Sequence, residues 1–156
     1  MSDQNWKKSS PAYGYVALTG SDSETIPVNP MENVRFNQHG ALENIKFSQS
    51  SGTLTVLESG DYKIKFILLI GGPKSTSVYG IFLNHIPVSL TDYGITRQVD
   101  NAILMLTGQA IIHIPRNTKI HLKNIGRTTD ILLPFVIDAG KTIPVNAASL
   151  SIEKLS

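Results

Sequence analysis

Residues 52–70 read GTLTVLESGDYKIKFILLI, and this stretch decides the fold. Two segments rich in β-branched and aromatic residues, which favour strands, surround a turn at Glu58–Asp61. The glycine in that turn suits a hairpin. In the second segment Tyr62, Ile64 and Phe66 alternate with lysines. The alternation predicts a strand with one buried face and one face in water.

From Phe66 to Ile70 the same strand becomes apolar on both faces. Two further segments, Ile103–Leu106 and Ile131–Ile137, share this property. Two stacked sheets hide only one face each, and monomers rarely expose long apolar patches. We therefore expect a symmetric partner to cover these faces. The alternative is that they are central strands with a loop lying over them.

The rest of the chain continues in short apolar runs, separated by clusters of Gly, Pro, Asn, Asp and Ser. No long window has helical periodicity. Regularly spaced strands with turn signals between them are typical of an all-β sandwich or barrel. A chain of 156 residues fits one domain. We expect a flexible N-terminal tail at residues 1–10 and the β-domain at residues 11–156.

Composition excludes several classes of function. The formal net charge of +2 is small and the basic residues are scattered, so we expect no nucleic-acid partner. The absence of cysteine excludes disulfides, thiol catalysis and cysteine-based metal sites. The apolar runs are far shorter than the ~20 residues of a membrane helix, so we expect no membrane insertion. The N-terminus, MSDQNWKKSS, lacks the apolar core of a secretory signal. This predicts synthesis in a cytosol, or a chain whose signal has been removed.

His113 and His121 flank the turn Pro115–Thr118 and invite comparison with a metal-binding pair. If that turn is a hairpin loop, His113 faces Ile120 and His121 points to the other face of the sheet. A shift of one residue in register would reverse this. However, no acidic or thiol ligand lies nearby in sequence to complete a site. We expect no metal and no cofactor.

The chain also lacks the signatures of an enzyme. It contains no G-x-S-x-G elbow and no phosphate-binding or calcium-binding loop. Most aspartates occupy turn positions, where their side chains cap the backbone; they are Asp61, Asp92, Asp100, Asp130 and Asp138. The aromatic residues Tyr13 and Tyr15 flank Gly14. Lectins use exposed aromatics for stacking, but such a pair more often packs one face of a sheet.

Five segments share their order and character with a known superfamily. They are PAYGYVAL (residues 11–18), LESGDYKIKF (57–66), IFLNHIPV (81–88), AIIHIPRNTKIHLKNIG (110–126) and AASLSIEKLS (147–156). This order resembles the tumour-necrosis-factor (TNF) and complement-globular-head superfamily, whose domains are ten-stranded jelly rolls that assemble as compact trimers. The chain departs from that pattern at His85, where glycine is usual, and at Arg116-Asn117, where Gly-Asp is usual.

Within that superfamily, the PAYGYVAL opening and the SLSIEKLS ending are most similar to the bacillus spore-surface group. This group includes the C-terminal heads of collagen-like exosporium glycoproteins and the small exosporium basal-layer proteins. Because this sequence has no Gly-X-Y stalk, it is more like the basal-layer type. The resemblance implies a place at the spore surface or exosporium after synthesis in the cytosol. It also implies that the strands flanking Pro115–Thr118 belong to different sheets.

We therefore expect a non-enzymatic, homotrimeric jelly-roll module that builds a bacterial spore or other surface layer. The alternative is a cytokine-like or lectin-like head that recognises a protein or a glycan. Further partners are other surface-layer proteins or glycans. The residues assigned to the trimer contact are Ile67, Leu69, Tyr13, Tyr15 and Leu122. The residues assigned to the core are Tyr62, Ile64, Phe66, Leu150 and Ile152.

Overall fold

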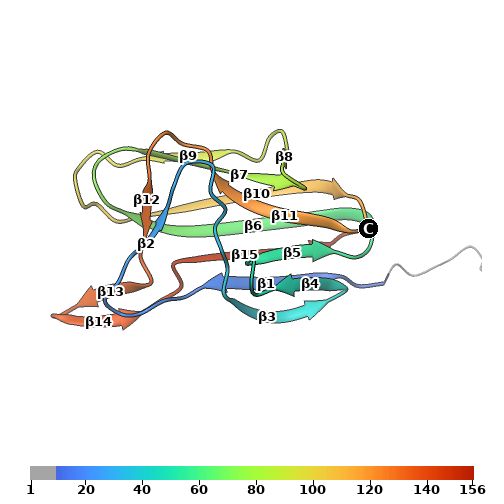
Figure 1. Cartoon of the computed structure of the whole chain (residues 1–156), viewed down its shortest axis with the longest axis horizontal. Coiled ribbons are helices and arrows are strands. Elements are labelled where there is room, and N and C mark those ends of the chain that lie inside the picture. Colours follow the sequence, from blue (N-terminus) through green and yellow to red (C-terminus); the bar gives the residue numbers. More distant parts are fainter. Residues whose placement is uncertain (1–9) are drawn as a thin grey trace, which may run out of the picture.

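The computed structural model describes residues 10–156, which fold into two antiparallel sheets and a separate two-stranded ribbon (Figure 1). Sheet A contains β1 (Tyr13–Leu18), β2 (Ile26–Val28), β3 (Gln38–Glu43), β6 (Gly60–Gly71), β10 (Leu104–Ile114), β12 (Asp130–Leu132) and β15 (Ala148–Lys154). Sheet B contains β4 (Ile45–Ser48), β5 (Thr53–Val56), β7 (Thr76–Leu83), β8 (Ile86–Pro87), β9 (Tyr93–Thr96) and β11 (Thr118–Asn124). The ribbon consists of β13 (Phe135–Asp138) and β14 (Lys141–Pro144).

The described residues contain no helix, as the sequence predicts. They form fifteen strand segments, against the ten that the resemblance implies. Some of the difference lies in short segments such as β2 and β8. Each of these carries a proline, which cannot donate to a ladder and so limits pairing. The ribbon β13–β14 adds two more segments outside the sandwich.

Strand β6 lies at the centre of sheet A, between β10 on one side and β15 on the other. Its buried side chains meet those of β15 in register, with Phe66 opposite Leu150 and Ile64 opposite Ile152. The five residues assigned to the core from the sequence are each at most 2% exposed. They belong to one apolar cluster that also includes Leu54, Val56 and Ile81 of sheet B.

Leu122 is a correction to the predicted trimer contact. It is only 1% exposed in the single chain, because it points from β11 into the core beside Ile81, its register partner. Its neighbours His121 and Lys123 take the opposite face of the strand. No area of Leu122 therefore remains for contact with another subunit.

The turn at Glu58–Asp61 is also different from the expected hairpin. Its flanking strands β5 and β6 lie in sheets B and A, so the turn is a corner between the sheets. The Tyr62 hydroxyl donates a 2.7 Å hydrogen bond to the Glu58 carbonyl across this corner. Gly60 is needed for close approach, because a Cβ there would lie 2.5 Å from the Ser156 carbonyl oxygen.

Two other turns lie in segments that carry the resemblance. The strands flanking Pro115–Thr118, β10 and β11, belong to different sheets, as the resemblance implies. Asn84 and His85 have φ values of 48° and 71°, which are those of a type I′ hairpin turn between β7 and β8. Histidine thus takes the left-handed conformation at a position where glycine is usual.

Candidate assembly face

The outer face of sheet A is the surface formed by the outward side chains of β1, β15, β6 and β10. The strand registers align these side chains in rows across the four strands. One row contains Ala17, Ser149, Ile67 and Thr107, and the row before it contains Tyr15, Ser151, Lys65 and Gln109. The register therefore brings Ile67 and the two tyrosines, which are far apart in sequence, onto one surface.

One half of this face is apolar. Ile67 and Leu69 are half-buried, because neighbouring strands cover only their flanks. Met105 lies opposite Leu69 in register and is 59% exposed. Ile103, just before β10, is also exposed and lies with Leu133 against Gly71. The single chain thus leaves a continuous aliphatic surface at one end of β6 and β10.

The other half of the face combines tyrosines and charges with one exposed isoleucine, Ile111, which lies opposite Lys63 in register. Tyr13 and Tyr15 are 43% and 39% exposed. They line an open hollow of about 340 Å³ together with Lys63, Lys65 and Glu153. Glu153 stands between Tyr13 and Lys63 in register. This hollow offers aromatic rings for stacking beside donors and acceptors of hydrogen bonds.

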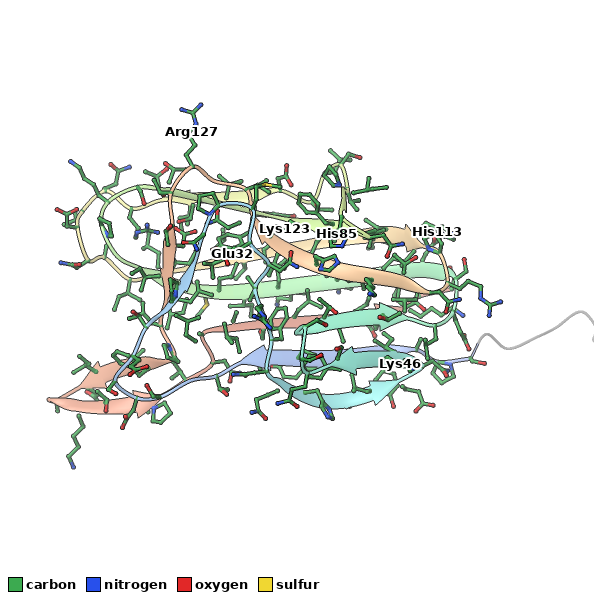
Figure 2. The ribbon with its side chains drawn as sticks, in the orientation of Figure 1. Glu32, Lys46, His85, His113, Lys123 and Arg127 are labelled. Carbon is green, nitrogen blue, oxygen red and sulfur yellow. The ribbon has the colours of Figure 1, made fainter. Side chains whose placement is uncertain are left out.

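His113 lies at the C-terminal end of β10 (Figure 2). There it contacts two other side chains in the arrangement of a catalytic triad. Its Nδ1 lies 3.0 Å from Asp61 Oδ1, and its Nε2 lies 3.4 Å from Ser59 Oγ. All three residues are exposed, with the side chains of His113 and Asp61 62% and 54% accessible. Water therefore competes for the hydrogen bonds that His113 makes with Asp61 and with Ser59. The geometry gives Ser59 no dry site in which an oxyanion would be stabilised.

His121 has a different environment, on the outer side of sheet B. It is 5% exposed and stacks on the ring of His85, with ring centroids 4.6 Å apart. Its Nδ1 lies 3.0 Å from the Asn33 amide nitrogen. Burial first, and then the nearby charges of His85, Lys123 and Lys119, lower the pKa of His121 to about 4. The ring is therefore neutral at pH 7.

The two histidines that flank Pro115–Thr118 thus lie on different sheets and do not form a metal pair. Within residues 10–156 no group of three or more His, Asp or Glu side chains is placed to hold a metal ion. The same residues contain no helix long and apolar enough to cross a membrane. Trp6 and most of the predicted N-terminal tail lie outside the described residues.

A buried polar cluster at one end of the sandwich was not expected from the sequence. Arg97 and Asp130 are 1% and 0% exposed, with Arg97 Nη2 3.6 Å from Asp130 Oδ1. Ser77 Oγ connects them, accepting a 2.8 Å bond from Arg97 and donating a 2.5 Å bond to Asp130. Burial and the charge of Asp130 together raise the pKa of the adjacent Tyr79. Asp130 is therefore a buried ion-pair partner and an exception to the turn role predicted for most aspartates.

Comparison with known proteins bears on the fold. No family model matches this sequence, and no curated protein matches it. The structure resembles that of Eiger TNF from S. frugiperda, with a TM-score of 0.72 and 8% identity, covering 94% of this chain and 93% of that chain. It also resembles the globular domain of zebrafish complement 1qA protein, with a TM-score of 0.60 and 17% identity, covering 91% of this chain and 94% of that chain. Similarity over nearly the whole length shows that this chain has the all-β jelly-roll fold of TNF and complement globular domains.

Proposed function

We propose that this chain is a non-enzymatic module that assembles as a homotrimer through the outer face of sheet A. The observation that carries the proposal is the change along β6 at Phe66. Beyond this residue the outward side chains are Ile67 and Leu69, with Met105 exposed beside them. Burying this aliphatic surface against two other copies would remove it from water, which stabilises the assembly by about 25 cal/mol for each Å² of apolar area.

Light scattering coupled to size-exclusion chromatography tests the assembly directly. We expect a mass of three chains at micromolar concentration. Raising the ionic strength should leave the trimer intact, because the proposed contact is mainly apolar. A stable monomer at micromolar concentration would contradict the proposal.

For the biological setting, we propose a structural role in a bacterial spore or other surface layer, with synthesis in the cytosol. The support is the resemblance of residues 11–18 and 149–156 to the bacillus spore-surface group. The role would be shape and assembly, with other surface-layer proteins as neighbours. Antibody labelling of intact spores should place the protein in the outermost layer. Labelling confined to the mother-cell cytosol would contradict this setting.

A second candidate function is recognition of a glycan, favoured by the hollow lined by Tyr13, Tyr15, Lys63 and Glu153. Because this hollow lies on the face that the trimer would use, the two functions compete for the same surface. A glycan array distinguishes them when it is probed with the wild type and with Tyr13→Ala/Tyr15→Ala. Binding that the double variant loses, at an unchanged oligomeric mass, would favour recognition.

The exposed arrangement of Ser59, His113 and Asp61 provides the test of the non-enzymatic proposal. We expect Ser59→Ala and His113→Ala to leave the slow hydrolysis of an activated ester such as p-nitrophenyl acetate unchanged. His39→Ala is the control for the general reactivity of an exposed histidine. A loss of turnover in both variants, with the control unaffected, would show hydrolase activity instead.

A further inference from the structure

The ribbon β13–β14 lies outside both sheets. Figure 1 shows it projecting from one end of the molecule, opposite the C-terminus. Its two-residue turn, Ala139-Gly140, has φ values of 50° and 77°, as a type I′ hairpin requires. At its base, Val145 donates a 2.9 Å backbone hydrogen bond to the Pro134 carbonyl. The ribbon is thus a well-formed hairpin with defined register.

This ribbon is apolar on both faces. Val136 and Ile143 are register partners and share one face, while Phe135 and Ile137 share the other. Ile137 is 68% exposed and Ile143 is 43% exposed. An isolated two-stranded ribbon is only marginally stable in water. A ribbon with aliphatic side chains on both faces therefore needs a covering surface that its own chain does not fully supply.

A suitable surface occurs at the same end of the strands. Leu69, Ile103 and Met105 form the apolar end of the outer face of sheet A, and Ile103 and Met105 are more than half exposed. The backbone of the chain entering the ribbon is fixed to this end, because Leu133 donates a 3.1 Å hydrogen bond to the Leu69 carbonyl. The base of the projecting ribbon and the flat apolar end therefore lie at the same end of the strands, and the ribbon extends outward from there (Figure 1).

We propose that the ribbon of one protomer packs across Leu69, Ile103 and Met105 of the next protomer around the trimer. This inference rests on the trimer proposed above. A rotation about an axis parallel to the strands would bring the ribbon base of one protomer to the same end as the apolar surface of the next. Each protomer then gives one ribbon and receives another, which is a heterologous contact that closes into a ring.

A second copy fits this role better than an unrelated partner. The single chain exposes both halves of the contact, one projecting and one flat, and each is aliphatic. The flat half is continuous with the face that the trimer would bury, through Leu69 and Ile67 on β6. One threefold arrangement would thus cover both exposed features at once.

The first experiment compares two isoleucines of equal exposure. Ile137 in the ribbon and Ile86 in β8 of sheet B are both 68% exposed. We expect Ile137→Asp to raise the trimer dissociation constant by at least about ten-fold, because an isoleucine loses its apolar contact. Ile86→Asp should leave it within about two-fold, since surface changes have small effects. Circular dichroism at low concentration checks that both variant monomers fold.

The second experiment uses the absence of cysteine in this chain. Ile137→Cys/Ile103→Cys protein, treated with a short bis-maleimide, should give covalent dimers and trimers on a denaturing gel. Ile137→Cys/Ile86→Cys protein is the control and should remain a single chain. Mass spectrometry of the linked peptides shows which residues are joined.

The outcomes separate the two proposals. A wild-type trimer whose dissociation constant is unchanged by Ile137→Asp, and whose ribbon is not cross-linked to Ile103→Cys, would overturn the ribbon contact and leave the trimer standing. A linkage formed only within one chain would overturn it as well. A wild-type protein that stays monomeric would overturn both the trimer and the ribbon contact.

Discussion

His121 combines a neutral ring, a buried position and cationic neighbours, and this makes the fold sensitive to acid. Its ring nitrogen Nε2 has no hydrogen-bond partner among the described residues. The pKa is lowered to about 4 in the folded chain, against 6.5 for an exposed histidine. Between these two pH values the unfolded chain binds more protons than the folded one. The stability that the neutral His121 contributes is therefore fully present above pH 6.5, and it is lost as the pH falls towards 4.

We expect His121→Phe to make unfolding less dependent on pH, because phenylalanine keeps a ring against His85 and does not titrate. The wild type should lose up to roughly 3 kcal/mol between pH 7 and pH 4 through this residue. The measurement is urea unfolding at several pH values. His39→Phe, at an exposed position, is the control. If the free energy of unfolding falls by the same amount between pH 7 and pH 4 in the wild type and in His121→Phe, other groups cause the loss.

The buried pair of Arg97 and Asp130 should be the most sensitive polar contact in the fold. Asp130→Ala leaves the Arg97 charge buried and uncompensated, so we expect a loss of about 3–5 kcal/mol in the free energy of unfolding. Asp61→Ala removes the partner of the exposed His113 and should cost less than about 1 kcal/mol. Denaturant unfolding of both variants gives the comparison. If both variants lose the same free energy of unfolding, burial is not what makes the Arg97–Asp130 pair sensitive.

Strand periodicity is a local pattern, so for single residues it predicts only which face of a strand each side chain takes. It places Tyr62, Ile64 and Phe66 on the inner face, where the structure has them. The alternation of Lys119, His121 and Lys123 with Leu122 is likewise enough to place Leu122 inside. The sequence does not predict the pairing of Arg97 with Asp130, because it joins the residue after β9 to the first residue of β12 and neither flanking sequence signals the contact.

At the scale of elements, β10 and β6 fit closely because of one glycine. Gly108 faces Phe66 in register, and a Cβ at Gly108 would clash with the Phe66 ring and lie 2.6 Å from Tyr93. Phe66 and Tyr93 pack edge to face, with centroids 6.0 Å apart. The tyrosine hydroxyl donates a 2.8 Å hydrogen bond to the Gln109 carbonyl. The glycine thus allows β9 to cover the edge of sheet A.

We expect Gly108→Val to destabilise the protein by about 1–3 kcal/mol through overpacking, despite the higher strand propensity of valine. Gly40→Val in β3 is the matched control. The nearest atom to a Cβ there is Tyr15 Cδ2 at 3.2 Å, on a partly exposed ring that is able to shift. Thermal unfolding should separate the two variants. A stable Gly108→Val protein would show that β9 moves aside without cost.

The turns that connect the two sheets show why the positions of strands are easier to predict from sequence than the strands with which they pair. The segments at Thr53–Val56 and Gly60–Gly71 have clear strand patterns, and the glycine between them correctly signals a turn. Nothing in that turn specifies whether the second strand pairs with the first. The pairing is set by β11 and β15, more than sixty residues away in sequence, which hold β5 and β6 in different sheets. Only the resemblance carried such long-range information, at Pro115–Thr118.

At the scale of the whole molecule, the outer face of sheet A must either stay in water or be covered. Its apolar half is built by β6 and β10, and its other half by Tyr13, Tyr15 and charged residues. One end of the face is thus mainly aliphatic, and the other is mainly polar apart from the exposed Ile111, so a trimer contact there would be dry at one end and more hydrated at the other. The sequence predicts this face through the double-sided apolar pattern of β6. For the ribbon it indicates only β13, as part of the apolar run Ile131–Ile137, and gives no sign of β14.

We therefore expect Ile67→Asp/Leu69→Asp to give monomers or insoluble protein. Two carboxylates in each of three copies would have to lose their hydration within one contact, which costs several kcal/mol for each unpaired charge. Ile86→Asp/Leu90→Asp is the control, because it places the same two charges at residues that are 68% and 95% exposed outside sheet A. Light scattering measures the mass, and circular dichroism shows whether soluble monomers keep the β-fold. A soluble, intact trimer of Ile67→Asp/Leu69→Asp would mean that the subunits meet through another surface.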